Sequence, residues 1–190
     1  MVEVTATIEP GTRKKFRAWL QRNHAKKTEI WLLYFRNGPP RHITYLDIVE
    51  ECMCFGWVDG IAKRVDEHLA QRLTPRKAKS HWTELNKERA RRLIEAGLMT
   101  SAGESCLPDL DPKRFRIPEP IEAALRSDPE CWSNFSRFPA LYQRVRVGYV
   151  AEMLKRDPIE YDKRLRNFID KTRANKMFGN WDDTKLKVTR

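Results

Sequence analysis

The stretch from Cys52 to Asn86 reads CMCFGWVDGIAKRVDEHLAQRLTPRKAKSHWTELN and decides the fold of the first half of the chain. Two runs within it, Gly60–Val65 and His68–Thr74, flank a short turn and predict the strands of a β-hairpin. A further run, Glu29–Arg36, is rich in strand-forming residues. The three runs together predict a small antiparallel sheet packed with helices, which is an α+β fold.

Helical signals surround this predicted sheet. Residues 12–23 place their apolar side chains on one side and begin at a threonine able to cap a helix. Thr44 with Asp47 three residues later predicts a weak capping box, and Gly56 ends the helix that follows. Another helix is expected over residues 80–96, capped by Ser80 and terminated by the glycine after it.

The second half of the chain predicts a helical subdomain that follows a linker. The segment 108–120 contains four prolines and few periodic apolar residues. Asp128 and Asp157 are each followed by proline, as at a helix N-cap. We therefore expect an α+β N-terminal domain over 1–107, a linker over 108–120, a C-terminal helical subdomain over 121–176, and a tail over 177–190 that is frayed or docked through Phe178 and Trp181.

Composition indicates a soluble, folded protein. The chain has 190 residues, of which 41% are hydrophobic and 33% are charged. No run reaches the roughly 18 apolar residues of a membrane-spanning helix, and the first residues do not resemble an export signal. A cytoplasmic location is the expectation that follows.

The cysteines and histidines do not suggest a metal site. Cys52 and Cys54 form a Cys-x-Cys pair inside a helical pattern, where residues two apart point to different faces. Reduced, buried thiols are expected, and the four histidines show no zinc-binding spacing. We predict neither a metal nor a cofactor.

A formal charge of +11 indicates anionic partners. The densest basic segment, residues 71–92, has eight Lys or Arg against two Glu. An anionic small molecule and a nucleic acid are both compatible with this charge. A solvated face that keeps the protein soluble explains it equally well.

The FGWVDG segment is predicted to form a sharp corner that displays Trp57 and Asp59 at one edge of the sheet. In a functional role, Trp57 is a stacking platform and Asp59 is a general base or a hydrogen-bond acceptor for a ligand. In a structural role, Trp57 fills the core and Asp59 caps a turn. Lys63, four residues after Asp59, is positioned to set the charge of that carboxylate or to bind an anion.

A second candidate feature is an anion cradle after the hairpin. Arg72, Thr74 and Arg76 alternate with period two, so we expect them to project the same way. Ser80 at a helix start adds backbone N–H donors for an anion. Surface ion pairs of the arginines with Glu50, Glu51 or Asp66 are the alternative. The predicted ligand-binding residues, with one tryptophan wall and one amide added from the next helix, are Trp57, Asp59, Lys63, Arg72, Thr74, Arg76, Ser80, Trp82 and Asn86.

Two other functions stay open at this point. The basic C-terminal helices suggest a nucleic-acid or anionic-surface binder that uses Arg164, Arg166, Lys171 and Arg173. An enzyme with Asp59 as its base is the third possibility, although one carboxylate without a partner names no reaction.

Motifs in the central stretch resemble the YdeI/OmpD-associated family, also called bacteriocin-protection proteins. They are ECMCFGWVDG at 51–60, Lys63 with Asp66, QRLTPRK at 71–77, and the Ser80, Trp82, Asn86 spacing. The resemblance extends over about residues 16–176, excluding the linker around 106–120. It implies a compact α+β part followed by a helical bundle and a role in envelope stress or bacteriocin tolerance, with no assigned reaction. With the residue patterns, it predicts a pocket for a phosphate- or nucleotide-like anion.

Overall fold

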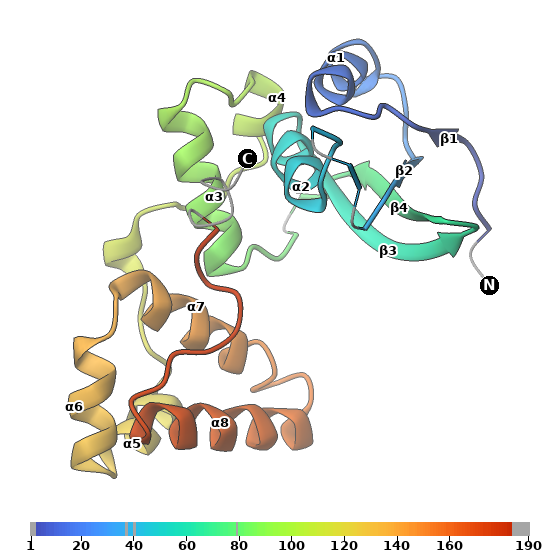
Figure 1. Ribbon diagram of the computed structural model, residues 1–190. Helices are drawn as coiled ribbons and strands as arrows, with labels where there is room; N and C mark the ends of the chain where they lie inside the picture. Colours follow the sequence, from blue (N-terminus) through green and yellow to red (C-terminus); the bar gives the residue numbers. More distant parts are fainter. Residues whose placement is uncertain (1–2, 37, 40, 79, 184–190) are drawn as a thin grey trace. The chain divides into compact units, whose positions relative to one another are not determined.

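The computed structural model describes residues 3–36, 38–39, 41–78 and 80–183 (Figure 1). The described chain forms two compact units. Unit 1 contains residues 3–81 and 89–108, and unit 2 contains residues 82–88 and 109–183. One helix, α3, therefore contributes its first turn to unit 2 and the rest to unit 1.

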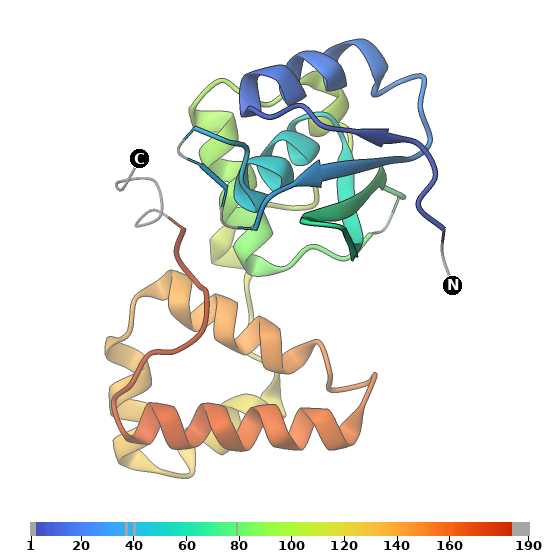
Figure 2. The same cartoon turned by 45° about the vertical axis from the view of Figure 1, so that its right-hand side comes forward.

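Unit 1 is built on a four-stranded sheet with the order β1-β2-β4-β3. Strand β1 (Thr7–Ile8) runs parallel beside β2 (Ile30–Tyr34), as Figure 2 shows. Strand β4 (His68–Pro75) lies antiparallel between β2 and β3 (Trp57–Val65). The α+β class is confirmed, but the sheet is mixed because the two-residue β1, too short to produce a sequence pattern, adds a parallel pair.

The hairpin is longer than the sequence pattern predicts. Strand β3 begins at Trp57, so the FGWVDG segment is the start of the strand rather than a separate corner. The register shifts between Asp59 and Ala62, which marks a bulge. Gln71 fills this bulge by donating its side-chain amide to the Gly60 carbonyl over 2.7 Å.

Local caps fix the helices of unit 1. Helix α1 (Arg13–Asn23) begins after Thr12, whose hydroxyl accepts from the Lys15 N–H. Helix α2 (Tyr45–Cys54) begins with the predicted capping box. Both helices bury apolar side chains in one core with the sheet, including Phe16, Leu20, Ile48, Trp57 and Leu73.

The end of α2 packs closely against the short helix α4 (Ser101–Glu104). Gly56 has a φ of +69°, and a Cβ there would lie 2.6 Å from the Ala102 carbonyl oxygen. A Cβ on Gly103 would lie 2.5 Å from the Cys54 carbonyl oxygen. Glycine at both positions therefore permits this approach of the two backbones.

Helix α3 (Glu84–Glu95) begins three residues later than the sequence suggests. Thr83 caps it by accepting the Asn86 N–H over 3.1 Å. Ser80 instead donates its hydroxyl to the Lys77 carbonyl, so the predicted Ser80 cap is wrong. The predicted end of α3 is confirmed, because Gly97 has positive φ and the Leu98 N–H donates to the Leu93 carbonyl.

Unit 2 is helical. After a 3₁₀ turn (Pro112–Arg114) come α5 (Glu119–Arg126), α6 (Pro129–Arg137), α7 (Ala140–Ala151) and α8 (Pro158–Arg173). Asp128 and Asp157 cap α6 and α8 as predicted. The four helices share a core that includes Ile121, Phe135, Tyr142, Val147 and Phe168.

The first part of the tail is docked on unit 2. The Trp181 indole packs edge-on against Tyr142, with 5.6 Å between ring centroids. The Arg146 guanidinium lies 5.3 Å from the Phe178 ring centroid and donates to the Asn180 carbonyl. Docking through Phe178 and Trp181 is thus the alternative that holds for residues 177–183, while 184–190 lie outside the described residues.

Candidate functional site

The structure separates the two arginines of the predicted cradle. Arg72 lies opposite Trp31 in the β4–β2 pair, and its Nε donates to the Glu29 carboxylate over 2.7 Å. Arg76 follows the end of β4, donates its backbone N–H to the Gly56 carbonyl, and donates Nη1 to the His81 carbonyl over 3.3 Å. The expectation that both side chains project the same way is wrong, because the strand alternation ends at Pro75.

Trp57 belongs to the core of unit 1. Its side chain is 1% exposed, and its indole N–H donates to the His24 carbonyl over 3.1 Å. The ring packs against Trp19 in an edge-on arrangement, with centroids 6.2 Å apart. The structure therefore supports the structural role of Trp57 and provides no ligand-facing wall at this position.

Asp59 accepts a short hydrogen bond from a tyrosine that the sequence did not point to. The Tyr45 hydroxyl donates to the Asp59 carboxylate over 2.6 Å. Asp59 is the register partner of Leu73, which is fully buried, so it lies on the sheet face that packs against α2. Burial raises the pKa of Tyr45, and the hydrogen bond to Asp59 raises it further. Tyr45 therefore keeps its proton and acts as a donor.

Two nearly buried arginines lie near this pair. Arg76 follows β4 and Arg89 lies on α3. Each is 9% exposed. Burial lowers the pKa of Arg76 even though the Asp59 charge opposes the change. The Arg89 charge acts to lower the pKa of Tyr45, against the effects of burial and of Asp59. Burial raises the pKa of Tyr34, and the Asp59 charge raises it further. We name Tyr34, Tyr45, Asp59, Arg76 and Arg89 the Asp59 corner.

The buried thiols beside the corner are poor nucleophiles. Burial raises the pKa of Cys52 strongly. Burial also raises the pKa of Cys54 to about 11. A thiol acts as a nucleophile only as its thiolate, so both side chains are inert near neutral pH. The corner therefore combines two guanidinium groups, two tyrosine hydroxyls and one carboxylate, and the thiols beside it are unreactive.

Three residues in this corner carried almost no signal in the sequence. Tyr45 is the first residue of α2, and only the tertiary packing of that helix on the sheet brings it to Asp59. Tyr34 ends β2, and Arg89 lies in the middle of α3. The one usable signal was the Thr44 cap, which fixes where α2 begins and hence where Tyr45 stands.

The other predicted site residues are dispersed. The Lys63 ammonium is 6.0 Å from the Trp31 ring centroid, and Thr74 is the register partner of Val58. Ser80 is engaged with Lys77 as described above. Trp82 and Asn86 belong to unit 2, whereas the Asp59 corner belongs to unit 1. A role of these residues in ligand binding stays a prediction.

Two of the four basic residues of unit 2 that we considered for nucleic acid pair with acids. Arg164 pairs with Glu160 over 2.9 Å and stacks on the Tyr149 ring at 3.9 Å. Arg173 pairs with Asp128 over 2.6 Å. Arg166 donates to the Asp162 carbonyl, and Lys171 lies exposed in the last turn of α8.

Glu50 and Glu51, considered as partners for the hairpin arginines, instead pair with arginines of α1.

The described residues contain neither a candidate metal site nor a helix that could span a membrane. No group of three or more His, Cys, Asp or Glu side chains in that part of the chain is arranged to hold a metal ion. None of the helices within the described residues combines the length and the apolar character needed to cross a membrane.

Two family profiles match different parts of the chain. A profile described as "Domain of unknown function (DUF8412)" matches residues 8–106, which is just over half of the chain. A second profile, described as "Bacteriocin-protection, YdeI or OmpD-Associated", matches residues 114–175. No curated protein and no solved structure matches the chain significantly.

The second match supports the predicted family over the C-terminal helices, which lie within the expected range of about residues 16–176. The motifs that suggested the resemblance, at 51–86, fall in the segment matched by the first profile. The bacteriocin-protection profile covers α5 to α8, the helical part of the predicted resemblance. The chain therefore belongs to the DUF8412 family, and its C-terminal helices match the profile described as "Bacteriocin-protection, YdeI or OmpD-Associated".

Proposed function

We propose that unit 1 binds a small phosphate- or nucleotide-like anion at the Asp59 corner. The observation that carries this proposal is the burial of two guanidinium groups, those of Arg76 and Arg89, near the hydrogen bond from Tyr45 to Asp59. The Arg76 Nη1 donates to the His81 carbonyl. An anion beside these guanidinium groups would accept further charge-assisted hydrogen bonds from them.

The neighbouring side chains fit the recognition of an anion. Tyr45 is 46% exposed and holds its proton, so it can turn its hydroxyl from Asp59 toward an incoming oxygen. Arg89 supplies a second guanidinium, and guanidinium groups bind phosphate oxygens in a bidentate manner. Asp59 then orients the ligand by accepting one of its hydroxyl or amino protons.

The proposal is for binding rather than for catalysis. Cys52 and Cys54 are held protonated by burial, and Tyr45 is no base at neutral pH. The corner thus supplies donors and charge but no activated nucleophile.

A thermal-shift experiment with matched variants tests the proposal. Inorganic phosphate and adenosine monophosphate are added to the wild type, to Arg76→Gln and to Arg72→Gln, with sodium chloride at equal ionic strength as a control. Binding at 100 times Kd stabilises by about 2.7 kcal/mol. For a unit of this size, each kcal/mol shifts Tm by roughly 4–8 °C.

The two variants separate the corner from a general effect of charge. Arg72→Gln removes the same charge from a side chain that is paired with Glu29, so it should keep the wild-type response. Arg76→Gln should lose the response while its own Tm stays within a few degrees of the wild type. Arg89→Gln should weaken it. Equal responses of Arg72→Gln and Arg76→Gln would contradict the proposal.

The family description leads to a biological role as a further part of the proposal. Because the matched profile is described as bacteriocin-protection, we infer a contribution to bacteriocin or envelope-stress tolerance that depends on ligand binding. Complementation of a deletion strain tests this role: the wild-type gene and Arg72→Gln should restore tolerance, and Arg76→Gln should not. Full rescue by Arg76→Gln would separate the role from the corner.

A further inference from the structure

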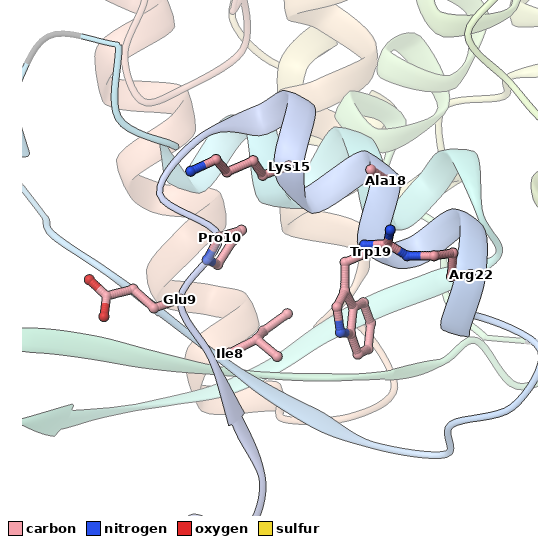
Figure 3. Close-up of a pocket in the computed structure, with 7 residues that line it drawn as sticks. All are labelled: Ile8, Glu9, Pro10, Lys15, Ala18, Trp19 and Arg22. Atoms are coloured by element: carbon pink, nitrogen blue, oxygen red, sulfur yellow. The ribbon is translucent and has the colours of Figure 1, made fainter.

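An open groove lies in unit 1 between the segment that follows β1 and one face of α1 (Figure 3). Its volume is about 350 Å³. The residues that line it are Ile8, Glu9, Pro10, Lys15, Ala18, Trp19 and Arg22. None of them belongs to the Asp59 corner, so the groove is a separate feature of the molecule.

The α1 side of the groove is cationic. Lys15, Trp19 and Arg22 have the spacing i, i+4 and i+7, which places them on one helix face with the indole between the two charges. The helix has no acidic residue. In the described part of the chain, neither Lys15 nor Arg22 makes an ion pair, whereas Arg13 and Arg17 on the other side of α1 pair with the acids of α2.

Trp19 offers a hydrogen-bond donor to the groove. Its ring is held by edge-on packing against Trp57 and by stacking on Phe16. Its indole N–H finds no acceptor among the described residues, and Figure 3 shows the ring nitrogen on the side nearer to Ile8. Trp19 is partly exposed, so this donor is available to a ligand.

The remaining lining residues are apolar or already engaged. Ile8, Pro10 and Ala18 provide an apolar floor. Glu9, the one acid of the lining, lies 3.3 Å from the His68 ring nitrogen Nε2. Two cations, one free N–H donor and an apolar floor are complementary to a ligand with a flat apolar body and a carboxylate.

We propose that this groove binds a small aryl carboxylate. The aromatic ring of the ligand lies on Ile8, Pro10 and the Trp19 indole, and its carboxylate accepts the indole N–H between Lys15 and Arg22. At roughly 30 Å³ for each water-sized group, the groove has room for on the order of ten non-hydrogen atoms, which is the size of a phenylpropionate.

Isothermal titration calorimetry with 3-phenylpropionate and its neutral amide tests this proposal on the full chain. The wild type should bind the carboxylate about tenfold more tightly than the amide, because charge-assisted hydrogen bonds are the stronger ones. The double variant Lys15→Gln with Arg22→Gln should bind both probes with the affinity of the amide. Lys14→Gln, an exposed position on α1 outside the groove, should behave as the wild type.

Three results would overturn the proposal. They are no binding of the carboxylate at about 10 mM, equal affinities of the wild type for the two probes, and a loss in Lys14→Gln as large as in the double variant. The Asp59 corner is tested independently, because Arg76→Gln should bind 3-phenylpropionate normally and the Lys15, Arg22 double variant should keep its response to phosphate.

Discussion

Substitution of Gly56 by alanine should destabilise unit 1 through two separate effects. Gly56 has a φ of +69°, and its added Cβ would lie 2.6 Å from the Ala102 carbonyl oxygen and 3.1 Å from the Cys106 sulfur. Gly97 has nearly the same φ, +65°, but a Cβ there meets nothing within 4 Å. The pair thus separates the cost of a left-handed backbone from the cost of a collision.

The two costs have different expected sizes. A left-handed conformation costs an alanine roughly 1–2 kcal/mol. Overpacking a well-packed site costs roughly 1–3 kcal/mol more, and the atom met at Gly56 is a backbone oxygen that cannot rotate away. We therefore expect Gly97→Ala to lose about 1 kcal/mol and Gly56→Ala to lose about 3 kcal/mol.

Equilibrium urea unfolding measures both values. Far-ultraviolet circular dichroism and tryptophan fluorescence should be followed together, since the two units can unfold in separate transitions. Gly103→Ala is a third member of the series, because its Cβ would lie 2.5 Å from the Cys54 carbonyl oxygen without any positive φ. If Gly56→Ala cost no more than Gly97→Ala, the close packing of α4 on the end of α2 would be refuted.

Three other predictions concern different parts of the chain. The hydrogen bond from Arg173 lowers the pKa of Asp128, so this stabilisation of unit 2 is present above about pH 4 and is lost as the pH falls below it. Asp128→Asn should therefore unfold with a flatter pH dependence between pH 5 and 3 in a series of thermal melts. Trp57→Phe loses the hydrogen bond to His24 and should lower the free energy of unfolding of unit 1, measured in urea, by roughly 1–3 kcal/mol. It should keep the thermal-shift response to phosphate, and loss of that response would show that Trp57 takes part in ligand binding. Trp181→Ala removes the contact with Tyr142 and should accelerate tryptic cleavage of the tail, and an unchanged cleavage rate would mean that the tail is not docked.

Local signals in the sequence predicted the helix ends well. Thr12, Thr44, Asp128 and Asp157 cap their helices because a cap depends on three or four consecutive residues. Ser80 failed because Thr83 is the residue whose hydroxyl accepts an N–H of the first turn of α3, that of Asn86. Strand β1 was missed because two residues show no periodicity, and its partner strand lies more than twenty residues away.

The candidate site was predictable only in part. Asp59 and Arg76 were predicted as site residues from the FGWVDG and QRLTPRK segments, and both lie in the Asp59 corner. Strand alternation wrongly grouped Arg72 with Arg76, because it says nothing about Glu29, which is 43 residues from Arg72 in sequence. Tyr45 reaches Asp59 through the packing of α2 on the sheet, which depends on the whole core rather than on any short motif.

Calorimetric titration of adenosine monophosphate and inorganic phosphate into the wild type and Arg76→Gln tests the central claim most directly. The account predicts measurable binding to the wild type and at least about a tenfold weaker affinity for the variant, because a buried charge-assisted contact is lost. Identical affinities of the two proteins, or no binding to the wild type, would contradict the assignment of the Asp59 corner as an anion site.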